Sequence, residues 1–355
     1  MGIASDLLCL FEEDDGTPEG SFASRVSAVL RAVGRIASKE EEETFTQVLA
    51  GNDAQLVGIL GHHVAATPAE ETGSRAFADL LQLSELAMDV APEKAPAAFA
   101  GSDGSLAVLA AIVRAHASDT GAVLRSGTRA MTQLTAALGL LGQLASRVAL
   151  PAAQRDAVDE SLVRAVFDLL GRPRDLAPNE DDGSGLDVLS TAMVNTLVCI
   201  HDQHLQAGCS PARNPVVVLL QSHESAGLFA EYLLTTINRA EELILPPALT
   251  LVEALFCFPP TADIFFTNDL RILLDVVLRE ATDLPETTRG EALRDQYLAV
   301  LLAVMAGETY QSKPYRKPEF LALLTELRAR AVDADGETVS ERLAIIDECL
   351  ELMQT

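Results

Sequence analysis

Four side chains that can ligate zinc lie within eleven residues of one another: Cys199, His201, His204 and Cys209. Their C-x-H-x2-H-x4-C spacing does not match the paired spacing of structural zinc sites. On a helix, Cys199 and His201 would lie about 200° apart around the axis and could not share one ion. The pattern therefore favours a buried thiol beside histidines on a polar helix face, and we predict no metal site.

The other reactive residue types form no catalytic arrangement. No serine or cysteine stands in a G-x-S-x-G elbow. The glycine-rich pieces at 101–105 and 183–185 lack the following Lys-Ser/Thr and the preceding strand of a phosphate-binding loop. The glutamates at 40–43 are expected to form a solvated first helical turn in a chain with 52 acidic residues. We therefore predict that the protein is not an enzyme and has neither a catalytic residue nor a cofactor.

A small basic cluster lies in the segment 313–317 (KPYRK). The chain has only four lysines, and two of them, Lys313 and Lys317, flank Tyr315 and Arg316 here. One interpretation is a solvated loop between helices, whose charges offset acidic neighbours. The other is a partner-binding site, because tyrosine and arginine are enriched where interfaces concentrate their binding energy.

The segment 267–282 (TNDLRILLDVVLREAT) predicts a helix that is apolar almost all round. Apolar side chains recur at i, i+3, i+4 and i+7, and Ile272, Val276 and Leu278 are expected to widen this buried face. Thr267 or Asn268 is expected to cap the helix. Charged side chains form a stripe with a spacing of four residues, in which Asp275 is placed to pair with Arg279. We interpret this stripe as facing a partner or solvent. The predicted partner-binding residues of the helix and the basic loop are Asn268, Asp269, Arg271, Asp275, Arg279, Lys313, Tyr315, Arg316 and Lys317.

Composition and charge exclude several classes of protein. Hydrophobic residues make up 48% of the 355 residues, which is enough for a packed core. The formal net charge of −26 argues against binding to nucleic acid or to an anionic membrane surface. No apolar run reaches the roughly 18–20 residues of a membrane span, and the N-terminal segment lacks the features of a signal peptide. Five dispersed cysteines are expected to be reduced, which predicts a cytoplasmic protein without membrane insertion.

Helical patterns follow one another along the chain, with short breaks at proline and glycine. The best strand-like run, 215–220, lies inside this series and is expected to be helical. About fourteen helices without a strand predict an all-α, armadillo/HEAT-like helical solenoid, and a compact irregular bundle is the alternative. The predicted helices cover roughly residues 22–37, 40–61, 73–90, 104–117, 121–149, 152–171, 185–206, 214–221, 224–240, 243–257, 267–282, 286–306, 317–331 and 338–353.

The helical pattern is the same on both sides of each break, and this predicts one continuous domain. Residues 1–20 are acidic and are expected to form a poorly ordered lead-in. The polar segment 172–185 is expected to be a surface loop of a single armadillo-like domain over 21–355, although a domain boundary there is the alternative.

Three stretches resemble the leucine-rich domain of the WISH/DIP/SPIN family, and the resemblance is best over 190–330. They are residues 214–242 (NPVVVLLQSHESAGLFAEYLLTTINRAEE), 249–284 (LTLVEALFCFPPTADIFFTNDLRILLDVVLREATDL) and 293–324 (LRDQYLAVLLAVMAGETYQSKPYRKPEFLALL). The chain carries no SH3 domain and no proline-rich stretch, so it is similar to the short fungal or protist form of the family.

The resemblance implies an armadillo-like protein that binds and activates the actin-related protein 2/3 (Arp 2/3) complex. Members of the family activate the complex without a preformed mother filament, so they nucleate linear actin filaments that seed branched networks, as at cortical and endocytic actin patches. Actin filaments are then an indirect partner. A generic armadillo/HEAT scaffold that binds a peptide or helix unrelated to actin is the alternative, and a helical metal-dependent or hydrolytic enzyme is the third.

Overall fold

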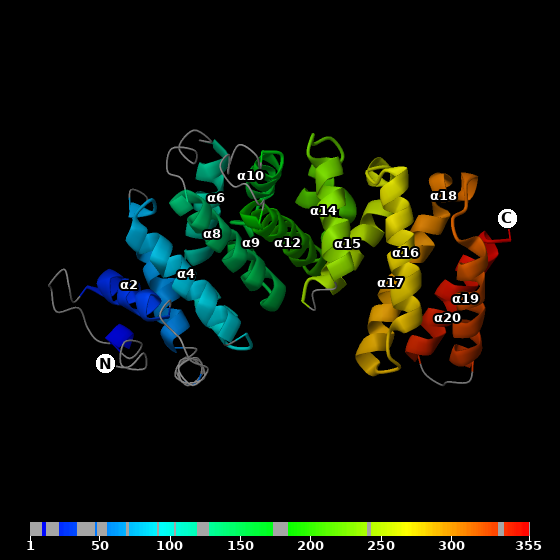
Figure 1. The fold of residues 1–355 in the computed structure, drawn as a ribbon, viewed down its shortest axis with the longest axis horizontal. Coiled ribbons are helices and arrows are strands. Elements are labelled where there is room, and N and C mark those ends of the chain that lie inside the picture. Colours follow the sequence, from blue (N-terminus) through cyan, green and yellow to red (C-terminus); the bar gives the residue numbers. More distant parts are fainter. Residues whose placement is uncertain are drawn as a thin grey trace. The chain divides into compact units, whose positions relative to one another are not determined.

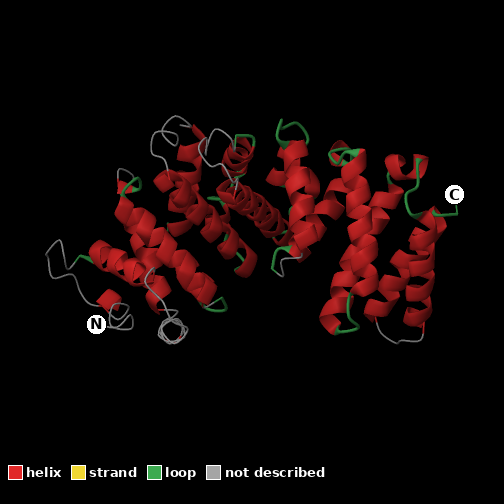
Figure 2. Cartoon of the chain, in the orientation of Figure 1, coloured by secondary structure: helices red, strands yellow, loops and turns green. Residues whose placement is uncertain are grey.

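The fold was analysed in a computed structural model that describes residues 9–11, 21–33, 47, 55–68, 71–90, 92–102, 104–118, 128–172, 184–239, 243–332 and 337–354. These residues are helical or lie in turns and loops, and none of them forms a strand (Figure 2). The chain divides into two compact units, residues 1–207 and residues 208–355.

The first unit stacks helices that are close in the sequence. Helix α4 packs on α2 and α8, α6 packs on α8 and α10, and α12 packs on α8 and α10. Residues 55–66 are also helical, and Cys9–Phe11 forms a 3₁₀ turn. The helices with their bounds are α2 (Phe22–Val33), α4 (Arg75–Val90), α5 (Ala95–Ala100), α6 (Ser105–Ser118), α8 (Thr128–Arg147), α9 (Ala152–Arg155), α10 (Glu160–Leu170) and α12 (Ser184–Gln206).

Buried polar side chains join α12 to α8. The Thr196 hydroxyl donates a hydrogen bond to the Leu138 carbonyl oxygen of α8 at 3.0 Å. The Gln203 amide donates to the Ala145 carbonyl oxygen at 2.7 Å and accepts from the Leu150 N–H at 2.8 Å. Because the last carbonyls of a helix have no partner within it, Gln203 satisfies the C-terminal end of α8 inside the core.

The second unit also stacks its helices in chain order (Figure 1). Helix α15 packs on α14 and α17, α16 packs on α14, α17 and α19, and α20 packs on α17 and α19. The 3₁₀ turns Pro211–Arg213 and Pro259–Thr261 lie between helices. The helices are α13 (Pro215–Leu220), α14 (Ala226–Arg239), α15 (Leu245–Cys257), α16 (Thr267–Asp283), α17 (Thr288–Ala306), α18 (Glu308–Ser312), α19 (Lys317–Val332) and α20 (Glu337–Leu352).

The predicted all-α class is confirmed, and consecutive helices stack within each unit as in an armadillo/HEAT-like helical solenoid. The strand-like run Pro215–Leu220 is a helix, as expected. Two details were wrong. The helix predicted over 152–171 is broken, because Asp159 adopts an extended backbone and its side chain accepts from the Leu162 N–H to start α10. The short helices α5 and α18 were not predicted, since neither is long enough to show a period.

The predicted single domain over 21–355 stays a prediction, because the two units are placed only individually. Most of the lead-in at 1–20 and of the loop at 172–185 lies outside the described residues, and α12 begins at Ser184. Among the described helices, none is both long and apolar enough to cross a membrane.

One carboxyl group at the α4–α8 contact makes the stability of the first unit depend on pH. Glu85 of α4 lies against Gly139 of α8, so closely that a side chain at position 139 would overlap its carboxylate. Burial, and to a lesser extent the negative charge of Asp89, raise the pKa of Glu85 from 4.5 to about 7. Asp89 itself accepts from Gln143 at 2.8 Å, and Arg147 donates to the Met88 carbonyl oxygen at 3.1 Å.

Folding therefore favours the protonated form of Glu85. The contribution of Glu85 to the free energy of unfolding is fully present at pH values below 4.5, and it is lost as the pH rises toward 7. We expect Glu85→Gln to raise the free energy of unfolding at about pH 8 by up to roughly 3 kcal/mol and to reduce its pH dependence. Urea titrations at several pH values measure this difference. Glu93→Gln, at an exposed carboxylate, is the matched control, and equal effects of the two variants would contradict the assignment.

Candidate partner-binding surface

The polar stripe of α16 and the basic loop lie together in the second unit, although about forty residues separate them in the sequence. The carboxylate of Asp275 joins them. Its Oδ1 accepts from the Arg316 Nε at 2.9 Å, and its Oδ2 accepts from the Tyr315 hydroxyl at 3.2 Å. We call the surface formed by the stripe and this loop the α16–loop surface.

Two guanidinium groups lie near the ring of Tyr315. The carbon atoms of the Arg271 and Arg316 guanidinium groups are each 5.7 Å from the ring centroid, which is within the range of a cation–π interaction. The buried Tyr310 of α18 donates to the Tyr315 carbonyl oxygen at 3.3 Å. Tyr315 is half-buried, and these contacts define its position.

Arg316 has an unusual backbone conformation. Its φ angle is 53°, and it is the only residue other than glycine with a positive φ among the described residues. This left-handed conformation costs a residue with a Cβ atom about 1–2 kcal/mol. The Arg316 carbonyl oxygen accepts from the Phe320 N–H at 3.0 Å, so the residue directly precedes α19 and helps to start it. Contacts with Tyr315 and Asp275 raise the pKa of Arg316, which keeps it charged.

Arg279 takes a different partner from the one predicted. Its guanidinium contacts Glu280 at 2.7 Å and the Asn238 amide oxygen of α14 at 3.1 Å. The expected pair of Asp275 with Arg279 is wrong, because Asp275 is already bound by Tyr315 and Arg316.

The predicted cap of α16 is also wrong. Phe266 is the N-cap residue and makes no side-chain hydrogen bond there, so neither Thr267 nor Asn268 caps the helix. Both follow the cap position and are exposed. Asp269 does lie in the first turn, where the helix dipole stabilises a negative charge, and its side chain is half-buried.

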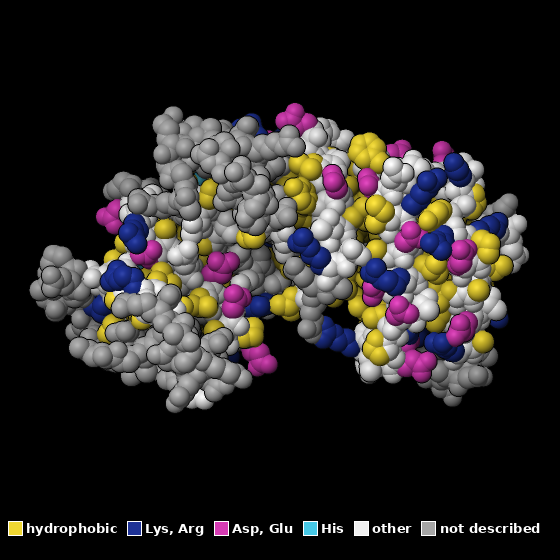
Figure 3. All heavy atoms as spheres, in the orientation of Figure 1, with side chains coloured by type: hydrophobic (Ala, Val, Ile, Leu, Met, Phe, Trp, Pro, Cys, Tyr) yellow, Lys and Arg dark blue, Asp and Glu magenta, His cyan; other side chains and the backbone are white. Residues whose placement is uncertain are grey.

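The remaining predicted residues lie on the loop side. Lys313 and Arg316 are exposed, and Lys317, the first residue of α19, is half-buried. On the face drawn in Figure 3, the second unit carries basic, acidic and apolar side chains interspersed with one another. Sequence reasoning missed Ile272, which was expected to pack into the core but is 50% exposed. Its position between the polar residues of the stripe was the signal that could have identified it.

Comparison with known proteins identifies the region that carries this surface. Residues 187–320 match the family model described as SPIN90/Ldb17, leucine-rich domain. This segment is similar to the SPIN90/Ldb17 leucine-rich domain. It includes all of α16 and the whole basic loop. The resemblance to the WISH/DIP/SPIN family inferred for 190–330 is thereby confirmed.

Curated fungal proteins also align with part of the chain. Protein dip1 of Schizosaccharomyces pombe is 31% identical over 134 residues, which is 35% of this chain and 34% of that protein. Protein LDB17 of Saccharomyces cerevisiae is 29% identical over 146 residues, which is 40% of this chain and 29% of that protein. The chain therefore spans about a third of the length of these relatives. A solved engineered protein aligns at 14% identity over 84% of this chain and 96% of its own, with a TM-score of 0.36, too low to establish a shared fold.

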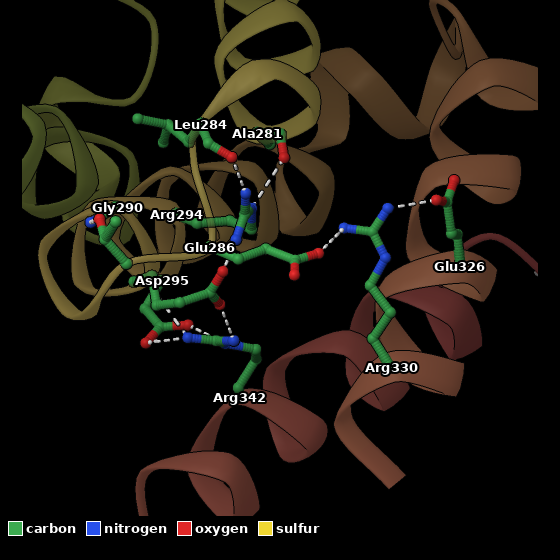
Figure 4. A network of polar contacts seen from close by, with 11 residues as sticks. Ala281, Leu284, Glu286, Gly290, Arg294, Asp295, Glu326, Arg330 and Arg342 are labelled. Carbon is green, nitrogen blue, oxygen red and sulfur yellow. Dashed lines mark hydrogen bonds and ion pairs between the residues drawn. The ribbon is translucent and has the colours of Figure 1, made fainter. Parts of the chain in front are cut away.

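A polar network outside the α16–loop surface holds the C-terminal end of α16 (Figure 4). Arg294 of α17 is 1% exposed and donates to the Ala281 carbonyl oxygen at 2.9 Å and to the Leu284 carbonyl oxygen. It also pairs with Glu291. Arg342 of α20 pairs with Glu291 in turn, and it donates to Asp295 at 3.0 Å. The segment that matches the family model is thus tied to α20, which lies beyond the matched residues.

The four candidate zinc ligands are not arranged as a metal site in the described part of the chain. No group of three or more histidine, cysteine, aspartate or glutamate side chains there could hold an ion. Burial raises the pKa of the Cys199 thiol to about 12 and lowers the pKa of His201 to about 4, so both are neutral near pH 7. His204 lies 3.2 Å from the Val158 carbonyl oxygen, and Cys209 is half-buried in the second unit.

Proposed function

We propose that this protein is a non-enzymatic activator of the Arp 2/3 complex that nucleates linear actin filaments without a preformed mother filament. The filaments then seed branched networks, such as those of cortical and endocytic actin patches, in the cytoplasm. The observation that supports the proposal is the match of residues 187–320 to the SPIN90/Ldb17 leucine-rich domain, a segment that contains the α16–loop surface.

The physical requirement on such an activator is differential binding. A protein that does no chemistry can shift the complex toward its active arrangement only by the difference between its affinities for the two arrangements. A rigid contact surface favours this role, because little conformational entropy is lost when it docks. The ties of Asp275 to Tyr315 and Arg316 provide that rigidity in the α16–loop surface.

Charge reversal on the surface tests the proposal. We expect Arg271→Glu and Lys317→Glu each to slow actin assembly with the Arp 2/3 complex by about tenfold, because each variant reverses a charge at the proposed contact and so disturbs its electrostatic complementarity. Pyrene-actin fluorescence with purified complex measures the rate. Arg164→Glu in the first unit, at an exposed arginine paired with Glu160, is the control and should retain full activity.

Full activity of both folded variants would remove these residues from the contact. Absence of any acceleration by the wild-type protein would instead favour the alternative function, an armadillo/HEAT scaffold for a peptide or helix unrelated to actin.

A further inference from the structure

The α16–loop surface has unbalanced positive charge in a strongly acidic chain. Ion pairs already neutralise part of it, because Arg316 contacts Asp275 at 2.9 Å and Glu319 at 3.4 Å, and Arg279 contacts Glu280. The charged side chains of this surface without an ion-pair partner among the described residues are three cations, Arg271, Lys313 and Lys317, and one carboxylate, Asp269. The formal net charge of the whole chain is −26, so this surface differs in sign from the average of the molecule.

An exposed isoleucine lies in the middle of the polar stripe. Ile272 stands four residues after Asn268, three before Asp275 and seven before Arg279, and these spacings place all four side chains on one face of α16. Its side chain is 50% exposed. Isolated exposed apolar residues are common, but one that is surrounded by polar groups at fixed positions matches the arrangement of an interface anchor with a hydrated rim.

Contacts within the surface position the guanidinium groups of Arg271 and Arg316 before any partner binds. Asp275 holds Arg316 and Tyr315, and the Tyr315 ring lies 5.7 Å from the Arg271 guanidinium carbon. The positive φ of Arg316 shows that the loop adopts one unusual backbone conformation to make these contacts. Because these groups are already ordered, less conformational entropy is lost from this surface when a partner segment binds.

We propose that the α16–loop surface binds an acidic partner segment, in which an aliphatic or aromatic side chain covers Ile272 and flanking carboxylates pair with Arg271, Lys313 and Lys317. This inference rests on the proposed function and adds the chemistry of the partner to it. The negative charge of the rest of the chain repels an acidic segment, so binding is directed to this one surface.

Synthetic peptides test the charge and the apolar anchor separately. The probes are three fluorescein-labelled peptides of equal length: one of glutamate and leucine, one with lysine in place of each glutamate, and one with serine in place of each leucine. Fluorescence anisotropy with the full chain measures binding at about 50 and 200 mM salt. We expect the glutamate–leucine peptide to bind at least tenfold more tightly than either other peptide, and to lose affinity as the salt concentration rises.

Variants of the surface locate the binding. Ile272→Ser and the double variant Lys313→Glu, Lys317→Glu should each weaken binding of the glutamate–leucine peptide by about tenfold, and the double variant should also lose the salt dependence. Val188→Ser, at another exposed apolar residue, and Arg164→Glu are the matched controls and should bind as the wild type does. Thermal unfolding followed by circular dichroism checks that each variant is folded.

Equal or tighter binding of the lysine–leucine peptide would overturn the inference, as would unchanged binding by both folded surface variants. The outcome for the proposed function is separate. Actin assembly by the wild-type protein without peptide selectivity would contradict only the acidic-segment inference, whereas selective peptide binding without actin assembly would contradict only the proposed function.

Discussion

Replacing Arg294 with alanine is expected to lower the free energy of unfolding by about 3–5 kcal/mol. The side chain is 1% exposed and its guanidinium is satisfied on three sides, by the carbonyl oxygens of Ala281 and Leu284 and by the carboxylate of Glu291. Its removal leaves the last carbonyls of α16 and part of the Glu291 charge without a donor, and buried groups without partners are costly. The loss would also loosen Arg342, which contacts the same glutamate.

Urea denaturation of the full chain, followed by circular dichroism, measures this loss. Arg330→Ala is the matched control, because Arg330 contacts Glu286 and Glu326 but its side chain is 48% exposed. Exposed ion pairs contribute about 0–1 kcal/mol to the free energy of unfolding, so the control variant should have nearly the stability of the wild type. Similar losses for the two arginines would show that burial does not set the strength of this network.

Gly290→Ala, which adds one methyl group, is expected to lower the free energy of unfolding by about 2–3 kcal/mol. Gly290 lies in the first turn of α17, where its N–H donates to the Thr287 hydroxyl oxygen at 3.1 Å. A Cβ atom at this position would overlap the Pro285 carbonyl oxygen, which belongs to the backbone and cannot move without breaking the tight turn between α16 and α17. The effect of Gly290→Ala is therefore steric.

A second glycine provides a control with the opposite sign. Gly58 lies in the helical segment 55–66, and a Cβ atom there would meet no atom within 4 Å. Gly58→Ala should stabilise the protein by up to about 1 kcal/mol, because alanine loses less conformational entropy in a helix. Thermal and urea unfolding of both variants measure the difference. A stabilising Gly290→Ala would contradict the close contact with Pro285.

The helical class and the polar stripe could be predicted from the sequence because both are local properties. Apolar residues at helical spacing indicate α16 without knowledge of any other segment. The meeting of Asp275 with Tyr315 and Arg316 could not be predicted, since it depends on how α19 returns to α16. For the same reason the local rule for charges four residues apart failed at Arg279, where a distant side chain had already taken the carboxylate.

The apolar side of α16 shows the same limit. Periodicity alone placed Ile272 in a wide buried face, but the neighbours of α16 cover Leu273 and Leu274 and leave Ile272 half exposed. The width of a buried face is set by the number of helices that pack on it, and this is a tertiary property. The cap of α16 was misplaced because several residues near its start can accept a backbone N–H, whereas the observed N-cap residue, Phe266, supplies no side-chain acceptor.

Actin assembly by purified Arp 2/3 complex with this protein, without preformed filaments or other activators, tests the central claim most directly. Single-filament fluorescence microscopy counts the filaments and shows their branching. The account predicts short unbranched filaments whose number rises with the concentration of the protein, and fewer of them with the Lys317→Glu variant. A filament number equal to that of actin and complex alone would contradict it.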